Sequence, residues 1–228
     1  MESRRPLWRS VLATAAGLLV ASGVGCSPRT TPVRSATTRA RPDPVASPPA
    51  APAAEPRVAS AKEREFRARL AKEFTHQIEA VAADPRVVEA VLEANRTNLA
   101  SEQEILAKDL LWRQAKGADD PLIAPYLDNP CARFLAQVHQ QTPAYAEVFV
   151  MDAKGCIVAE STKTSDYWQG DEKKWTESYH GGAGKVFVDE IQYDHSSQAY
   201  VVQISVPVRA ADGRTIGAMT VGVTAKDR

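Results

Sequence analysis

The sequence predicts an α+β domain in which several helices precede a five-stranded antiparallel sheet. Apolar residues recur at helical spacing from about residue 61 to residue 140. This period then disappears, and five short runs rich in β-branched residues follow, separated by turn residues. Helices followed in order by strands are typical of an α+β fold.

The charge of the chain is divided unevenly between its two parts. Residues 1–57 carry eight arginines against three acidic residues, a net charge of +5, so the remainder of a chain with zero net charge carries −5. An acidic folded part argues against a nucleic-acid partner. A chain of 228 residues has room for one domain of ordinary size and additional segments.

The first 25 residues have the pattern of an export signal. An arginine pair precedes the apolar run Val11–Val24, which is shorter than the roughly 18 residues that a membrane-spanning helix needs. Ser22–Cys26 is similar to a bacterial lipobox, in which the signal is cleaved before a cysteine that then carries lipid. We expect a lipoprotein anchored through Cys26 and facing the periplasm or the cell exterior; the alternative is a plain secretory signal.

Residues 26–60 are expected to form a tether. Residues 27–57 hold eight of the fifteen prolines and no aromatic residue, leucine or isoleucine. Such a composition cannot bury enough apolar surface to offset the entropy lost on ordering. We therefore expect a disordered, Pro/Ala-rich tether that holds a domain of residues 61–228 near a membrane.

An apolar stripe at spacings of four and three predicts the first helix of the domain. Its members are Phe66, Leu70, Phe74, Ile78 and Val81. Asp84-Pro85 interrupts the pattern. A second, short helix follows, with apolar positions at Val87, Val88, Val91 and Leu92.

Two further helices begin at capping patterns. Ser101, with Glu104 three residues later, predicts a capping box. The apolar positions of that helix are Ile105, Leu106, Leu110 and Trp112. Asp128-Asn129-Pro130 predicts the other start, because proline is favoured in the first turn of a helix. The inner face of this last helix is Phe134, Leu135 and Val138.

Five strands follow these helices. The runs Glu147–Met151 and Cys156–Glu160 flank a turn at Asp152–Gly155, which predicts a hairpin. Both runs are apolar at successive positions, so we expect both faces of the hairpin to be covered. The remaining runs are Lys185–Asp189, Tyr200–Val206 and Thr215–Val223.

Besides Cys26, the chain has only Cys131 and Cys156. Two such cysteines in an exported protein favour a disulfide, and the alternative is a pair of buried thiols.

The loop of residues 162–184 is dense in aromatic and charged residues. Rings and a few fixed charges are what a small polar ligand needs. Carboxylates beside Trp and Tyr suit an ammonium group, and Lys173 suits a carboxylate as a point charge. The alternative is that Trp168 and Trp175 pin the loop to the sheet while the charges, Glu172, Lys173 and Lys174 among them, face water.

This order of strands and loop resembles the Cache (PDC, PAS-like) sensor domains of bacterial receptors, over roughly residues 60–226. The resemblance implies a single Cache domain with a PAS-like sheet and a ligand held between sheet and loop. In amino-acid-binding members an Arg-x-Trp-Tyr run and a Tyr-x-Asp run hold the ligand. Here Trp175 and Asp194 match, whereas Lys173 replaces the arginine and Tyr193 directly adjoins Asp194. The ligand contacts expected on this basis are Asp166, Tyr167, Trp168, Asp171, Lys173, Trp175, Tyr193 and Asp194.

We expect an extracytoplasmic, membrane-tethered sensor that binds an amine, an amino acid or a short carboxylate. The loss of the bidentate arginine weakens the case for an amino-acid carboxylate. Because the chain ends at Arg228, just past the last strand, the expected output is a membrane signalling protein in trans. The alternative is a ligand-free envelope protein that docks a membrane partner.

An enzyme is not expected. The sequence has no Gly-x-Ser-x-Gly nucleophile elbow and no P-loop, and its four histidines lack metal-ligand spacing. No cofactor and no metal are therefore expected.

Overall fold

The structure is a computed structural model that describes residues 59–194 and 199–225. The predicted export signal, the lipid attachment at Cys26 and most of the tether lie outside these residues. Within the described part, no helix is both long enough and apolar enough to cross a membrane.

In order, the α-helices that the structure describes are α1 (Ala61–Ala82), α2 (Pro85–Thr97), α3 (Glu102–Gln114), α4 (Ala124–Leu127), α5 (Pro130–Gln141) and α6 (Lys173–Tyr179). Three of the helices, α2, α3 and α5, begin at the capping patterns that the sequence predicts. The side chains of Asp84 and Asn129 each accept a hydrogen bond from a backbone N–H in the first turn of α2 and α5, respectively. Both helices start with proline. The predicted capping box between Ser101 and Glu104 is present at the start of α3.

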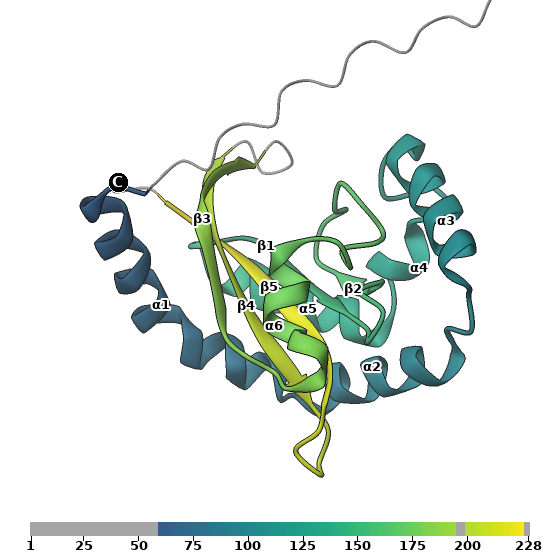
Figure 1. Cartoon of the computed structure of the whole chain (residues 1–228). Helices are drawn as coiled ribbons and strands as arrows, with labels where there is room; N and C mark the ends of the chain where they lie inside the picture. The colour runs from purple at the N-terminus through teal and green to yellow at the C-terminus, as the bar shows by residue number, and fades with distance from the viewer. Residues whose placement is uncertain (1–58, 195–198, 226–228) are drawn as a thin grey trace, which may run out of the picture. The chain divides into compact units, whose positions relative to one another are not determined.

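All five predicted strands form one antiparallel sheet. They are β1 (Tyr145–Met151), β2 (Ile157–Glu160), β3 (Phe187–Asp194), β4 (Ala199–Arg209) and β5 (Thr215–Thr224). Their order across the sheet is β2-β1-β5-β4-β3, and every neighbouring pair is antiparallel (Figure 1). The predicted fold class, helices followed by a five-stranded PAS-like sheet, is confirmed.

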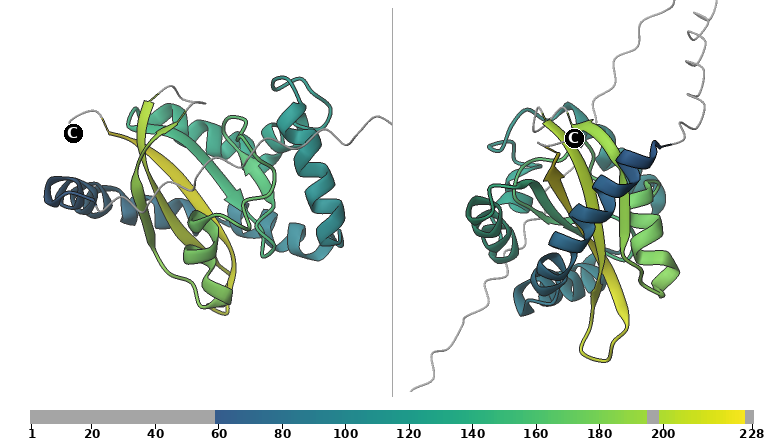
Figure 2. Two further views of the ribbon diagram at one scale, coloured as in Figure 1. Left: turned by 45° about the horizontal axis from the view of Figure 1, so that its top comes forward. Right: turned by 90° about the vertical axis from the view of Figure 1, so that its left-hand side faces the viewer.

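Both faces of the sheet are covered, as the apolar hairpin predicts. On one face α1, α2 and α5 contribute to a core cluster with Val148, Ile204 and Val221. On the other face α3, α4 and the segment between β2 and β3 pack against Phe149 and Met151. Figure 2 shows α5 and α6 on opposite sides of the sheet. The β2–β3 segment therefore lies over a sheet face of its own.

The buried face of α3 differs from the prediction. Ile105 and Trp112 are buried as expected, but Leu106 and Leu110 are 40% and 60% exposed. The position between the two buried apolar residues is Asp109, which is 3% exposed. Positions i, i+4 and i+7 share one helix face, so the true inner stripe runs through a carboxylate and not through the leucines.

The expected loop of residues 162–184 is not entirely loop. It contains α6 and a short 3₁₀ turn at His180–Gly182. Residues 161–172 connect β2 to α6 and contain no helix, and they are here called the covering loop. The third strand begins at Phe187 and runs to Asp194, in agreement with the predicted strand pattern ending in Tyr193-Asp194.

The disulfide alternative is wrong in this structure, because Cys131 and Cys156 are both free and buried. They belong to different core clusters, Cys131 with the helices α1 and α2 and Cys156 with α3 and the covering loop. Burial raises the pKa of each thiol to about 12, so both remain protonated near neutral pH. The alternative of two buried thiols is the one observed.

Candidate ligand-binding site

A polar cavity of about 210 Å³ lies between the sheet and the covering loop. The sheet contributes Glu147, Phe149, Asp189, Gln192, Tyr193, Val201 and Gln203 to its lining. The loop and α6 contribute Thr164, Ser165, Asp166, Gln169, Glu172 and Lys174. This is the place between sheet and loop where the resemblance puts a ligand.

A glycine makes room for the carboxylate at the base of the cavity. Glu147 on β1, Gly222 on β5 and Gln203 on β4 form one row across the sheet. A Cβ atom on Gly222 would lie 2.7 Å from Cγ of Glu147. The Glu147 side chain therefore extends over Gly222, where its Oε1 accepts a hydrogen bond of 2.7 Å from Nε2 of Gln203. Only 6% of Glu147 is exposed.

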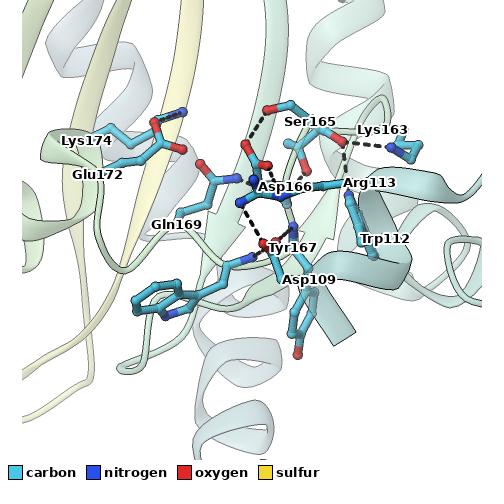
Figure 3. Close-up of polar contacts among 12 residues, drawn as sticks. Asp109, Trp112, Arg113, Lys163, Ser165, Asp166, Tyr167, Gln169, Glu172 and Lys174 are labelled. Atoms are coloured by element: carbon cyan, nitrogen blue, oxygen red, sulfur yellow. Dashed lines mark hydrogen bonds and ion pairs between the residues drawn. The ribbon is translucent and has the colours of Figure 1, made fainter. Parts of the chain in front are cut away.

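Helix α3 holds the covering loop in place from its outer side (Figure 3). Oδ1 of Asp109 accepts hydrogen bonds from the backbone N–H groups of Tyr167 and Trp168, at 2.8 and 3.0 Å. The guanidinium of Arg113 lies between two carboxylates, 2.7 Å from Asp109 and 2.8 Å from Asp166. The position of Asp166 in the cavity wall thus depends on a helix more than 50 residues earlier in the chain.

Glu160 ends β2 as a fully buried carboxyl group. Its Oε2 accepts hydrogen bonds from both the backbone N–H and the hydroxyl of Thr164, each at 2.9 Å. Its Oε1 has no hydrogen-bond partner in the part of the chain that the structure describes. Burial raises the pKa of Glu160 to about 7, with the hydrogen bonds from Thr164 opposing the rise.

Gln169 presents a second buried acceptor, and this one lines the cavity. The residue is 1% exposed, and its Nε2 donates a hydrogen bond of 2.8 Å to the carbonyl of Asp166. Its Oε1 has no partner among residues 59–194 and 199–225. In Figure 3 this oxygen points away from the Asp166 backbone, on the side where Glu172 and Lys174 lie. A buried acceptor without a partner costs about 1–3 kcal/mol, which a ligand that donates to it would recover.

The lysine in the lining is Lys174, not the predicted Lys173. The side chain of Lys174 is 11% exposed, with Nζ 3.0 Å from a carboxylate oxygen of Glu172 and 5.6 Å from the centre of the Phe149 ring. Lys173 is exposed. The expectation that Lys174 faces water is wrong, because successive residues of a helix point about 100° apart.

The aromatic rings of the segment pack onto the protein and do not line the cavity. Tyr167 is buried against Trp112 and Tyr126, with ring centroids 5.5 and 5.6 Å away. The indole N–H of Trp168 donates to the carbonyl of Lys154, and that of Trp175 donates to the carbonyl of Asp152. Both carbonyls belong to the β1–β2 turn, so these rings pin the segment in place, as the alternative interpretation predicts.

Two of the eight predicted ligand contacts, Asp166 and Tyr193, line the cavity. Asp171 is exposed and does not. Asp194 forms the last residue of β3, and its side chain lies outside the described structure. A role in ligand binding stays a prediction for all eight residues.

The sequence interpretation missed the polar groups on the sheet and on α3. Glu147 and Gln203 each interrupt an apolar strand, and a charged or amide side chain inside such a run was a usable signal. Asp109 was detectable in the same way, as a carboxylate on the stripe of Ile105 and Trp112. Gln169 carried no comparable signal, because nothing in a loop sequence indicates which polar side chain is buried.

A larger hollow of about 1000 Å³ borders the first turns of α1 and the strands β3 and β4. Its charged side chains carry both signs, and Lys62, Glu65, Arg69 and Lys72 are exposed. We take the smaller cavity as the candidate site, because it is lined by Gln169, a buried side chain whose Oε1 has no partner among the described residues. In the described part of the chain no cluster of His, Cys, Asp and Glu suited to a metal ion is found.

No model of a known protein family matches the chain, and no curated protein sequence matches it. Solved structures do resemble it. The sensor domain of the histidine kinase DctB from V. cholerae matches with a TM-score of 0.46 and 15% identity, over 72% of this chain and 53% of that one. The E. coli DcuS sensor domain matches with a TM-score of 0.39 and 12% identity, over 70% and 92%.

A third similar structure is the ligand-binding domain of the Pseudomonas aeruginosa chemoreceptor PctC in complex with GABA. It matches with a TM-score of 0.37 and 14% identity, over 72% of this chain and 59% of that one. This chain spans about half the length of the DctB domain that it matches. These structures are sensor or ligand-binding domains, among them domains of a histidine kinase and of a chemoreceptor.

Proposed function

We propose that the domain is a small-molecule-binding sensor module whose ligand occupies the cavity between the sheet and the covering loop. The observation that carries this proposal is Oε1 of Gln169, a buried acceptor without a described partner in an otherwise polar, sheet-backed cavity. Buried polar groups are normally satisfied, and one that is not satisfied is a candidate contact for a ligand. Amines, amino acids and short carboxylates are the candidate ligands.

Ligand binding would act on the position of the covering loop. That loop is tied to α3 through Asp109 and to the β1–β2 turn through Trp168. A ligand that contacts Gln169 from the sheet side adds a further attachment and shifts the loop toward its ordered position. The output then passes to a membrane signalling protein in trans, at the surface formed by the loop and α3.

A thermal-shift screen of amines, amino acids and short carboxylates tests this function. A ligand at 100 times its Kd stabilises the folded state by about 2.7 kcal/mol, a readily measured shift. Gln169→Leu should abolish the shift, because it removes the free acceptor. Gln140→Leu is the matched control, since it is the same substitution at an exposed position of α5 outside the lining. A folded protein that none of these compounds stabilises would count against the function.

The membrane tether is a separate part of the proposal. It rests on the Gly25-Cys26 junction and on the proline-rich segment that follows. Cys26→Ser should move the protein from the membrane fraction to the soluble fraction of cells. Unchanged partitioning would remove the lipoprotein assignment and leave the ligand cavity untouched.

A second candidate function, docking of an envelope partner without a ligand, has one observation in its favour. Leucines around α3 are exposed, Leu99 to 86%, Leu110 to 60% and Leu111 to 59%. Exposed apolar side chains that gather in one region mark interaction surfaces. Crosslinking in cells separates the two functions: a stoichiometric partner lost in Leu110→Glu and retained in Gln169→Leu favours docking.

A further inference from the structure

The charge of the cavity lining indicates which ligand it selects. Four carboxylate side chains, those of Glu147, Asp166, Glu172 and Asp189, line it against the single ammonium group of Lys174. Two carboxylates have described cationic partners, Asp166 with Arg113 and Glu172 with Lys174. Together the four carboxylates and the one ammonium group give the lining side chains a formal net charge of −3. The lining therefore attracts a cation and repels an anion.

The second, independent observation is a buried acceptor. Gln169 is 1% exposed and lines the cavity, and its Oε1 has no partner within the described residues. Its amide N–H₂ is already engaged with the carbonyl of Asp166, which fixes the orientation of the amide and leaves the oxygen to accept. An ammonium group has three donors and no acceptor, and therefore suits this oxygen and the surrounding carboxylates.

A carboxylate ligand finds no comparable partner. The lysine in the lining is 3.0 Å from Glu172, and the nearby guanidinium of Arg113 is held between Asp109 and Asp166. Recognition of a carboxylate normally uses a bidentate arginine or several N–H donors that point into the site. Here both cations are already paired with carboxylates of the protein.

The size of the cavity limits the rest of the ligand. At about 30 Å³ for each water-sized group, 210 Å³ holds about seven such groups. The apolar part of the wall, Phe149 and Val201, suits a short alkyl chain. The Phe149 ring already lies 5.6 Å from Nζ of Lys174, so a cation has a place in this cavity.

We propose that the cavity selects a small monoamine with a short apolar chain and no carboxylate. This inference rests on the proposed function and narrows its ligand to one chemical class. The ammonium group lies between Oε1 of Gln169 and the carboxylates of the lining. Lys174 occupies part of this acidic space when the ligand is absent, and its charge opposes the binding of a second cation.

Isothermal titration of the full chain with four matched compounds tests the inference. n-Butylamine, butyrate, 1-butanol and 4-aminobutyrate have the same chain length and differ in charge. We expect binding of butylamine, at least tenfold weaker binding of the zwitterion, and no binding of butyrate. Preferential binding of butyrate, butanol or the zwitterion would overturn the amine assignment and leave the proposed sensor function standing.

Two variants with opposite expected effects test the geometry. Lys174→Met removes the competing charge and should tighten butylamine binding about tenfold. Gln169→Met removes the acceptor at similar volume and should weaken butylamine binding about tenfold. Lys173→Met is the matched control, because Lys173 is exposed outside the lining, and it should change affinity less than twofold.

Each other outcome has a defined meaning. Weaker butylamine binding in Lys174→Met, or unchanged or tighter butylamine binding in Gln169→Met, overturns the inference. If none of the four compounds binds the wild-type chain, the inference fails. The wider thermal-shift screen then decides the proposed function by itself, because that screen also contains amino acids and short carboxylates.

Discussion

The carboxylate of Asp109 accepts a hydrogen bond of 2.8 Å from the backbone N–H of Tyr167. The two residues are 58 positions apart in the chain, one on α3 and the other in the covering loop. Because Asp109 is 3% exposed, its bonds to the loop are shielded from water. The loop that covers the candidate site is therefore fixed by a helix that does not line the cavity.

Loss of this attachment should loosen the covering loop. Asp109→Ala removes two backbone hydrogen bonds to a charged acceptor and leaves the N–H groups of Tyr167 and Trp168 without their partner. We expect a loss of about 2–4 kcal/mol in the free energy of unfolding, measured by urea denaturation. Hydrogen exchange of these two amides should accelerate.

The control for this change is the exposed carboxylate of Asp119, on the turn after α3. Asp119→Ala should stay within about 0.5 kcal/mol of the wild type. Equal stability of the two variants would show that the Asp109 bonds contribute nothing to the fold.

Glu160 should make the stability of the domain fall as pH rises. Burial raises its pKa to about 7 in the folded state, above the ordinary value of 4.5. The folded state therefore holds the proton more tightly than the unfolded state. The resulting stabilisation is fully present below about pH 4.5 and is lost as pH rises through about 7, with a total on the order of 3 kcal/mol.

Urea denaturation from pH 4.5 to 8 measures this loss against the variant Glu160→Gln. The amide imitates the protonated carboxyl and can still accept from Thr164, but it does not titrate. We expect the difference in stability between wild type and variant to grow with pH. A difference that is constant across this range would contradict the raised pKa.

Two glycines of β5 should respond differently to the same substitution. A Cβ atom on Gly217 would lie 2.2 Å from the carbonyl oxygen of Met151, a backbone atom that cannot move aside without disturbing β1. A Cβ atom on Gly222 would meet the Glu147 side chain, which can rotate away. We expect Gly217→Ala to destabilise by about 3 kcal/mol or more and Gly222→Ala by about 1 kcal/mol.

The same pair separates folding from binding. Gly222→Ala should displace Glu147 and weaken ligand binding in a protein that remains folded. Thermal melting and titration of the two variants measure both effects. A Gly222→Ala protein that binds the ligand as well as the wild type would argue that Glu147 has no part in the site.

The two cysteines of the domain should behave as buried thiols. In a chain that carries Cys26→Ser, Cys131 and Cys156 should resist a thiol reagent in the native state, because both are about 1% exposed and their pKa values are raised to about 12. Denaturation without a reducing agent should expose two reactive thiols. Fewer than two would indicate a bridge.

The sequence by itself determined the five strands, four of the six α-helices that the structure describes, and the starts of several of these helices. The Ser101–Glu104 capping box, the Asn129-Pro130 start and the turn at Asp152–Gly155 depend on local chemistry, which the chain carries in any context. Five β-branched runs in succession were enough to predict the antiparallel sheet. The PAS-like strand order came from the family resemblance, and the structure has it.

Only the tertiary structure decided which polar groups meet around the cavity. Lys174 and not Lys173 faces inward, because the packing of α6 on the sheet sets the rotation of that helix. Trp168 and Trp175 donate hydrogen bonds to carbonyls of the β1–β2 turn, which comes within reach only after the chain has folded back. The local pattern marks Glu147 and Asp109 as polar residues at apolar positions, but it does not say what they contact. Burial of Gln169 depends on contacts between segments far apart in sequence, and a local pattern carries no information about such contacts.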